Sequence, residues 1–415
     1  MYARLSLDIG WSDLLYAALA SAAAGGRARR AAEIEARFSP GGDAFAALSA
    51  RSGFDLYLRA LALPAGSEVL VSGLTIPHMV EILAAHELRA VPFVLDPETL
   101  APPPGELERR RTTRTRALLF AHLFGQRAEL GALLAFARQH GLLVWEDCAQ
   151  AYAGDVWRGH VQADLALFSF GLIKTATAIQ GGILRVRDAP LRARMRALQA
   201  AWPVQPRADF LRRVGKAALL CALSRPRVFT RFVRHVERSG RDLDQLLHSA
   251  TRSFPGPDYL QRLRRAPSAP LLALLARRLA RPAASNAERR RAFGEELLAG
   301  LGEGVQVFGR YARERRHWVF ALGCDEPAQL VHALRAAGFD ASARSSLVAV
   351  ESGAGGAAPE ANRMLLERLV YVPLALCASA GERATLVRIV REAARVHELL
   401  PRGARTRAAH QPPAG

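Results

Sequence analysis

Lysine is almost absent from this chain of 415 residues. Lys174 and Lys216 are the only two lysines, although lysine and arginine together number 57. Nearly every cation is therefore an arginine, whose guanidinium stays protonated and is not a usable amine nucleophile. A lysine retained in such a chain indicates chemistry that needs an amine.

Paired cysteines are also lacking. The four cysteines, Cys148, Cys221, Cys324 and Cys377, lie far apart and form no CxxC pair. This spacing excludes a disulfide framework and a zinc-ligand cluster. We therefore expect a protein of the reducing cytoplasm without a metal site.

No run of apolar residues reaches the ~18 that a membrane-spanning helix needs. The segment "LLYAALASAAA" (14–24) has the apolar character of a secretory signal. The stretch before it carries Asp8 and Asp13 against Arg4, which is the wrong charge for such a signal. We predict an N-terminal helix here.

The net charge of +19 suggests an anionic partner. The chain has neither zinc-finger spacing nor an aromatic-basic RNA-binding signature, so we expect no nucleic-acid partner. A basic surface favours anionic small molecules, including phosphates.

Short apolar runs alternate with helical patterns through the first half of the chain. Helices are predicted at 77–88 and 127–141, and strands at 68–72, 90–96, 116–123, 142–147, 164–170 and 182–188. This alternation predicts an α/β fold with an open, mostly parallel sheet. Ligands of such sheets bind beyond the carboxyl ends of the strands.

The length fits one large domain and one smaller domain. We predict a large domain at 1–265 with a basic helical insertion at about 203–265, a small α/β domain at 266–400, and a disordered tail at 401–415. In the insertion, Phe210, Val214, Ala217 and Cys221 share one helical face. Packing of this face on the protein is favoured over contact with a membrane surface.

Lys174 follows the predicted strand 164–170, and Asp147 and Ser169 end strands at the same edge of the sheet. A neutral lysine amine can condense with a carbonyl group, and pyridoxal 5'-phosphate (PLP) is the commonest partner of this kind. PLP needs a carboxylate for its ring nitrogen, a helix start and hydroxyl groups for its phosphate, and a side chain against its ring.

The sequence offers a candidate for each need. Asp147 would serve the ring nitrogen and Ser169 the phosphate. Ser52 and Gly53, just before a predicted helix, form a candidate phosphate cup, and Ile76 or His78 would cover the ring.

The stretch "WEDCAQAYAGDVWRGHVQADLALFSFGLIKTATAIQGGILRV" resembles the central signature of the DegT/StrS family of PLP-dependent sugar aminotransferases. "HLFGQ" and "SGLTIPHMVEILAAHELRAVPFVLD" resemble further segments of that family. The similarity is good over roughly residues 45–200 and weak over 280–400. It implies the fold-type-I architecture of PLP-dependent transferases and a homodimer that builds each site at its interface.

The resemblance also implies roles for particular residues. Lys174 matches the lysine that binds PLP covalently, and Asp147 the acid that pairs with the ring nitrogen. Gln150 matches a residue beside the PLP hydroxyl group, and Ser169 the phosphate-binding serine. His317 falls where the family has a segment near the substrate, although a structural role is an equal alternative.

This sequence departs from the family pattern in several places. Thr175 stands where an asparagine usually follows the lysine, Gln180 replaces an acidic residue, and Ile76 replaces the aromatic residue against the ring. The G-x-N-x-R-M segment, which reaches the neighbouring subunit's site, is replaced by "RRAPSAPLLALLARRLA" (264–280). The coenzyme half of the site is thus retained and the sugar half altered.

We therefore predict an aminotransferase that moves an amino group from an amino acid, expected to be glutamate, to an anionic keto acceptor such as a nucleotide-linked keto sugar. Two alternatives stay open. One is another PLP reaction, such as a lyase, and the other is a binding or scaffold protein that kept the fold.

Overall fold

The computed structural model describes residues 1–4, 7–23, 25–251, 256, 258–281, 284–352, 358–374, 376 and 378–393. A seven-stranded sheet forms its centre, in the order β1-β9-β8-β7-β5-β2-β4. The strands are β1 (Ala44–Ala47), β2 (Glu68–Ser72), β4 (Arg89–Phe93), β5 (Thr115–Ala121), β7 (Leu143–Asp147), β8 (Leu165–Ser169) and β9 (Gly182–Val186). The predicted tail at 401–415 lies outside the described residues.

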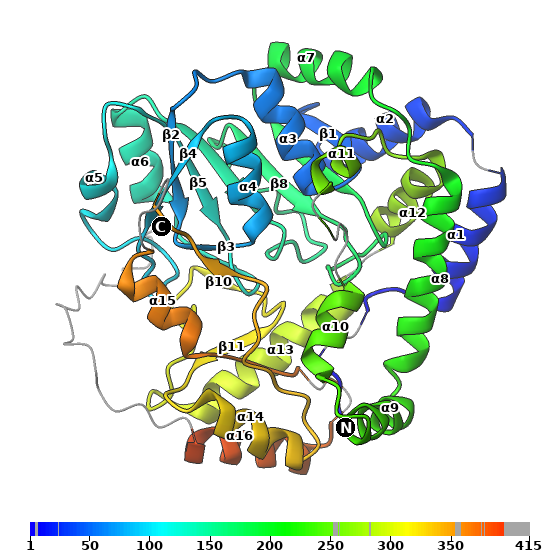
Figure 1. The fold of residues 1–415 in the computed structure, drawn as a ribbon, viewed down its shortest axis with the longest axis vertical. Coiled ribbons are helices and arrows are strands. Elements are labelled where there is room, and N and C mark those ends of the chain that lie inside the picture. The colour runs from blue at the N-terminus through cyan, green and yellow to red at the C-terminus, as the bar shows by residue number, and fades with distance from the viewer. Residues whose placement is uncertain are drawn as a thin grey trace, which may run out of the picture.

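The five strands β4, β2, β5, β7 and β8 run parallel, and β9 runs antiparallel to β8 and β1. Alternate residues of a strand face opposite sides of the sheet, as β5 shows. Leu119 packs into the core on one face, whereas Leu118 and Phe120 pack into the core on the other. The predicted α/β architecture with a mostly parallel sheet is confirmed (Figure 1).

Helices cover both faces and one end of this sheet (Figure 1). The helices of this part of the chain are α1 (Trp11–Ala23), α2 (Arg27–Phe38), α3 (Ala50–Leu61), α4 (Pro77–Ala85), α5 (Glu106–Arg110), α6 (Gly131–Gln139), α7 (Ala189–Ala200), α8 (Arg207–Leu223), α9 (Pro226–Arg238), α10 (Leu243–Thr251), α11 (Tyr259–Leu263) and α12 (Ala269–Ala280). Of these, α9 and α10 lie away from the sheet, where α9 packs against α8 and α10 (Figure 1). The helix predicted near the N-terminus is α1.

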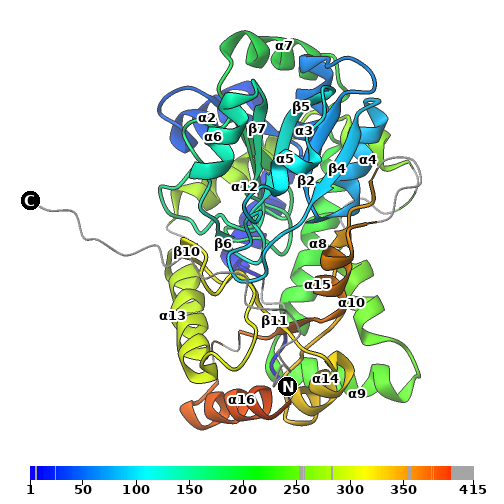
Figure 2. The ribbon, with the colours of Figure 1, turned by 90° about the vertical axis from the view of Figure 1, so that its left-hand side faces the viewer.

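A smaller unit with its own core lies beside the large one (Figure 2). It pairs β11 (Phe320–Gly323) with β13 (Leu369–Val372) in antiparallel fashion. Its helices are α13 (Ala284–Leu301), α14 (Pro327–Ala336), α15 (Glu360–Glu367) and α16 (Ala380–Ala393). Two short antiparallel strand pairs join this part of the chain to the large unit. β12 (Val348–Ala349) pairs with β3 (Leu74–Thr75), and β10 (Glu314–Arg315) pairs with β6 (Gln126–Arg127).

Two segments lie across the predicted division of the chain at residue 265. Helix α12 packs against α1 and α2 of the large unit. The N-terminal segment runs the other way, and Tyr2 donates its backbone N–H to Gly338 O of the small unit over 2.8 Å. The chain therefore crosses between the units more often than the simple division predicts.

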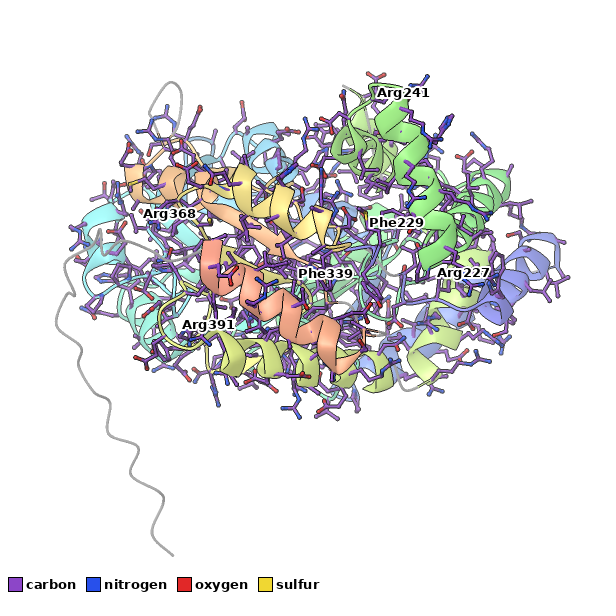
Figure 3. All side chains as sticks on the ribbon, turned by 90° about the horizontal axis from the view of Figure 1, so that it is seen from below. Arg227, Phe229, Arg241, Phe339, Arg368 and Arg391 are labelled. Atoms are coloured by element: carbon purple, nitrogen blue, oxygen red, sulfur yellow. The ribbon has the colours of Figure 1, made fainter. Side chains whose placement is uncertain are left out.

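The basic segment at 203–265 is helical, as expected. Phe210, Val214 and Ala217 of α8 are buried, and α8 packs against α1 and α12. The apolar face is thus used inside the protein. Figure 3 shows Arg227 and Arg241 at the outer edge of the α9 region. Among the described residues, no helix combines the length and apolar character needed to cross a membrane.

Candidate active site

A cavity of about 870 Å³ lies where β7 and β8 end and where the large and small units meet. Its size suits a coenzyme together with a small substrate. The predicted site residues that line it are Ile76, His78, Asp147, Gln150, Ser169 and Lys174. Parallel strands bring their carboxyl ends to one edge of the sheet, and this topology gathers residues that lie far apart in the sequence.

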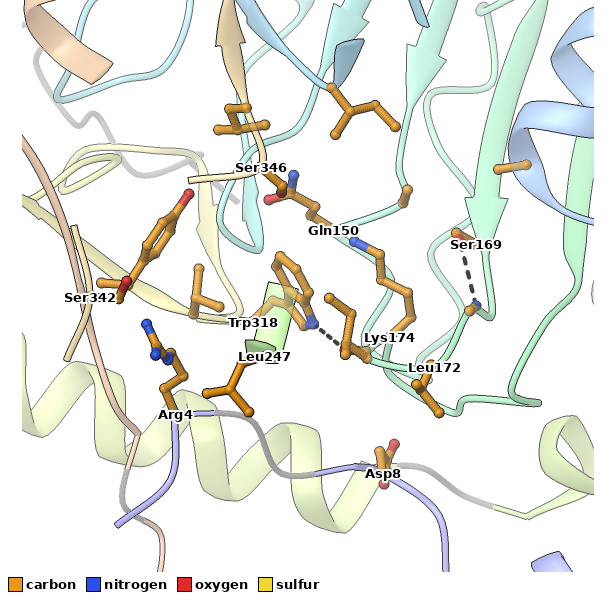
Figure 4. Close-up of a pocket in the computed structure, with 18 of the residues that line it drawn as sticks. Arg4, Asp8, Gln150, Ser169, Leu172, Lys174, Leu247, Trp318, Ser342 and Ser346 are labelled. Atoms are coloured by element: carbon orange, nitrogen blue, oxygen red, sulfur yellow. Dashed lines mark hydrogen bonds between the residues drawn. The ribbon is translucent and has the colours of Figure 1, made fainter. Parts of the chain in front are cut away.

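Lys174 lies in a turn just after β8, where its N–H donates to Gly171 O over 2.9 Å. Its Nζ lies 3.8 Å from the centre of the Trp318 ring (Figure 4). Burial lowers the pKa of this amine to about 8, with Asp147 opposing that shift and Arg51 reinforcing it. A pKa of about 8 gives Lys174 a substantial neutral fraction near neutral pH, as an amine nucleophile requires.

Asp147 is the last residue of β7 and faces the same cavity. Burial raises the pKa of its carboxyl group. The backbone N–H of Ala149, which donates to Oδ1 over 3.0 Å, and the charges of Lys174 and His122 oppose this rise. A cation bound next to Asp147 would favour its ionised form.

Gln150 and Ser169 are held in place by backbone amides. Gln150 Oε1 accepts the N–H of Phe124 over 2.8 Å, and Ser169 Oγ accepts the N–H of Gly171 over 3.4 Å. Both side chains border the cavity near Lys174 (Figure 4). Each is therefore oriented by the fold toward the space where a ligand would bind.

Ile76 and His78 lie at the start of α4. Ile76 is the N-cap residue, and Pro77 and His78 open the helix. His78 Nδ1 lies 2.9 Å from a guanidinium nitrogen of Arg51, and the His78 ring meets Tyr259 edge-on at 4.6 Å between centres. Both Ile76 and His78 remain candidates to cover a bound ring.

Ser52 and Gly53 differ from their predicted placement, because neither is among the residues lining the cavity. Ser52 Oγ donates to Leu263 O over 2.6 Å, and a Cβ at Gly53 would lie 2.1 Å from a methyl carbon of Leu184. Both residues therefore face the packed interior of the large unit. The cavity wall is formed instead by the residues just before them, Ser49, Ala50 and Arg51.

His317 also lies outside the cavity lining. Its Nε2 is 2.9 Å from Glu295 Oε1, and its ring packs so tightly on Gly294 that a Cβ there would clash. Burial lowers the pKa of His317. The structure thus favours the structural alternative, and the neighbouring Trp318 enters the cavity in its place.

Several residues of the cavity were not predicted from the sequence. Trp318 donates its Nε1–H to Ile173 O over 3.0 Å and so packs against the turn that contains Lys174. Asp8 Oδ2 accepts the N–H of Ala176 over 2.7 Å, just past that turn. Arg4 and Leu247 also reach the cavity (Figure 4). Of these residues, only Trp318 could have been suggested by the sequence, because it is an aromatic residue next to the candidate His317.

Among the described residues, His122, Glu146 and Cys148 form a buried group that could in principle hold a metal ion. The atoms of this group already have partners in the protein. His122 Nε2 lies 2.9 Å from Glu146 Oε2, and Glu146 Oε1 accepts the N–H of His160 over 2.7 Å. We therefore interpret the group as a buried polar network that supports the strand end bearing Asp147.

The chemistry of the cavity fits PLP. It presents the partly buried amine of Lys174, the partly buried carboxylate of Asp147, hydroxyl groups at Ser49 and Ser169, and the N-terminal end of α3. The last of these is a favourable place for a phosphate group, because helix N-termini present N–H groups and partial positive charge.

The fold is that of the fold-type-I PLP-dependent transferases. An aminotransferase from Streptoalloteichus hindustanus, TlmJ, superposes with a TM-score of 0.68 at 21% identity, covering 94% of this chain and 98% of that one. The sugar aminotransferase CalS13 from Micromonospora echinospora superposes with a TM-score of 0.66 at 20% identity, covering 94% of this chain and 100% of that one. The predicted architecture is therefore confirmed.

Residues 24–210 match the sequence model of the DegT/DnrJ/EryC1/StrS aminotransferase family. The predicted resemblance to this family is thereby confirmed for that part of the chain. The L-glutamine:2-deoxy-scyllo-inosose aminotransferase of Streptomyces fradiae is 38% identical over 160 residues, which are 37% of each chain. The GDP-perosamine synthase of Caulobacter vibrioides is 36% identical over 149 residues, which are 35% of this chain and 39% of that protein. The matched part thus spans well under half the length of these relatives.

Proposed function

We propose that this protein is a PLP-dependent aminotransferase that acts on a keto sugar or a related cyclic ketone. The observation that carries the proposal is the placement of Lys174 and Asp147, both partly buried, in one cavity. Burial lowers the pKa of the Lys174 amine to about 8, which makes this amine available as a nucleophile. The matched family segment, residues 24–210, contains both residues.

Each polar group of the cavity has a distinct task in this proposal. Bound PLP would supply an electron-withdrawing ring that stabilises negative charge at the donor's α-carbon. Asp147 would hold a proton on the ring nitrogen, because its buried negative charge favours a neighbouring cation. Ser169 would donate a hydrogen bond to the phosphate, and Gln150 would position the ring from its hydroxyl side.

Lys174 would first hold the coenzyme and then act as the base and acid of the reaction. Once an amino donor displaces it, Nζ can accept the proton of the donor's α-carbon. It can then return a proton to the carbon on the other side of the transferred nitrogen. Trp318 lies against Nζ and helps to exclude water from this exchange. The enclosed position suits a proton transfer that must not leak to solvent.

For the donor we propose glutamate or glutamine, since several similar proteins are named as L-glutamine-dependent aminotransferases. For the acceptor we propose a cyclic keto compound, and a nucleotide-linked keto sugar in particular. Arginines at the cavity wall, among them Arg289 and Arg290 of α13, favour an acceptor with phosphate groups. We further propose a cytoplasmic homodimer, in keeping with the family resemblance.

The absorption spectrum of the purified protein tests the proposal. Wild type, Lys174→Ala and Lys216→Ala are titrated with PLP and then mixed with glutamate or glutamine. Lys216 lies exposed on α8 outside the cavity lining, so it is the matched lysine control. We expect a visible band in wild type and Lys216→Ala that the donor bleaches, and no such band in Lys174→Ala.

The outcomes separate the open alternatives. A protein that develops the band but does not respond to any amino donor would be a scaffold that kept the coenzyme site. Release of an elimination product without amination of keto acceptors would identify a lyase. A wild-type protein that never develops the band would overturn the proposal.

A further inference from the structure

Arg51 is the second residue of α3, in its first turn. Ser49 is the N-cap residue, and its Oγ accepts the N–H of Ser52. Ser49 O accepts the N–H of Gly53 over 2.9 Å. Ser49, Ala50 and Arg51 therefore form the part of the helix start that faces the cavity.

Arg51 lines the same cavity as Lys174 and Asp147, and its charge acts on both groups. Its Nη1 lies 2.9 Å from His78 Nδ1. Since a guanidinium can only donate, His78 Nδ1 accepts, and the ring carries its proton on Nε2. Burial lowers the pKa of Arg51 to about 10, against the opposing charge of Asp147, so it stays protonated at neutral pH.

The start of α3 therefore brings positive charge to this end of the cavity. A protonated arginine adds its full charge to the partial charge of the α3 N-terminus, which is about half an elementary charge. The carboxylates of Asp147 and Glu81 also line the cavity and offset part of this positive charge. Such an arrangement is suited to an anion of more than one charge, and a guanidinium can bind phosphate oxygens in pairs.

We propose that Arg51 binds the phosphate group of the coenzyme, together with the first turn of α3 and Ser169. The inference rests on the proposed function only in assuming that PLP enters this cavity. It gives the phosphate a charged side-chain partner at the position where the sequence analysis had placed the Ser52-Gly53 pair. Arg51 also holds His78 through the hydrogen bond between their side chains. The same arginine would therefore bind the phosphate and position a side chain that can pack on the coenzyme ring.

Comparing PLP with pyridoxal, which lacks the phosphate, tests this role. Dissociation constants of both are measured by the change in absorbance for wild type, Arg51→Ala, Arg51→Lys and Arg213→Ala. Arg213 is the control, because its charge acts on Arg51 but it is not among the cavity-lining residues. Circular dichroism verifies that each variant is folded.

We expect Arg51→Ala to weaken PLP binding by about 10- to 100-fold, the loss typical of a charged hydrogen bond, and pyridoxal binding less than about 2-fold. Arg51→Lys should lose less than Arg51→Ala, because it keeps the charge without the paired donors. Arg51→Lys also tests the inference if Arg51→Ala does not fold. Arg213→Ala should leave the ratio of the two constants unchanged.

Equal losses for PLP and pyridoxal would overturn the inference, since they would mean that Arg51 acts through His78 or Asp147. Unchanged PLP binding in Arg51→Ala would overturn it as well. Failure of the proposed function gives a different result, because wild type would then bind neither compound or would bind PLP without responding to an amino donor.

Discussion

The Nζ atom of Lys174 lies 3.8 Å from the centre of the Trp318 ring, although the two residues come from opposite units of the molecule. The indole Nε1–H donates to Ile173 O, the residue just before the lysine. A residue of the small unit therefore forms part of the surroundings of the Lys174 amine. An aromatic face stabilises the charged form of an amine by about 0.5–2 kcal/mol.

We predict that Trp318→Leu lowers the pKa of Lys174 by about 0.5–1 unit, because the ammonium form loses its aromatic partner. The pKa of Lys174 is already lowered to about 8 by burial, so the neutral fraction at neutral pH should rise. The pH dependence of amine acylation, followed by mass spectrometry, measures this shift. Trp318→Phe keeps a ring face and should shift less; an upward shift in Trp318→Leu would contradict the assignment.

Gly125 sets the close approach of the Trp318 backbone. It has a φ of +88°, and a Cβ there would lie 2.2 Å from Trp318 N. Gly141 also has a positive φ, +62°, but nothing lies within 4 Å of its Cβ position. Replacing Gly141 by alanine therefore adds backbone strain alone, whereas replacing Gly125 adds backbone strain and a clash with Trp318.

We predict that Gly141→Ala lowers the free energy of unfolding by about 1–2 kcal/mol through backbone strain alone. Gly125→Ala should cost a further ~1–3 kcal/mol, because Trp318 must move. Chemical denaturation measures both values. Equal losses in the two variants would show that Trp318 is not held against Gly125.

Asp13 joins α1 to α12 through three arginines. Its Oδ1 accepts from Arg277 and Arg281 over 2.7 and 2.8 Å, and its Oδ2 accepts from Arg278 over 2.7 Å. Burial alone would raise the pKa of Asp13, but the hydrogen bond from Arg277 and the charges of Arg278 and Arg281 outweigh it and lower the pKa. Its ionised form therefore stabilises the fold.

We predict that Asp13→Asn lowers the free energy of unfolding by about 1–3 kcal/mol at neutral pH. Because the folded pKa lies below the unfolded value of 3.8, this stabilisation is present above that pH and is lost as the pH falls through the folded pKa. The difference in the free energy of unfolding between wild type and variant should stay constant from pH 7 to about pH 4 and should shrink as the pH falls further. Asp242→Asn, which removes an exposed partner of Arg344, should have little effect at any pH.

The sequence by itself determined the sheet and the strand-end residues of the candidate site. The strand 68–72 was predicted with its observed bounds, and the other predicted strands lie within a few residues of their observed positions. Asp147 and Ser169 end neighbouring parallel strands and Lys174 follows the second of them, so the three residues meet at one edge of the sheet. Local patterns are enough to locate strand ends. The antiparallel edge strand β1, "AFAA", was not predicted, since so short a run carries no distinctive pattern.

Only the tertiary structure decided which of two neighbours faces the cavity. Arg51 faces it and Ser52 does not, because the helix turns each successive side chain by a large angle and the N-cap fixes where that rotation starts. In the same way Trp318 enters the cavity while His317 is held by Glu295. The contributions of Arg4, Asp8 and Leu247 depend on contacts between segments far apart in the chain, and such contacts leave no periodic signal in a single sequence.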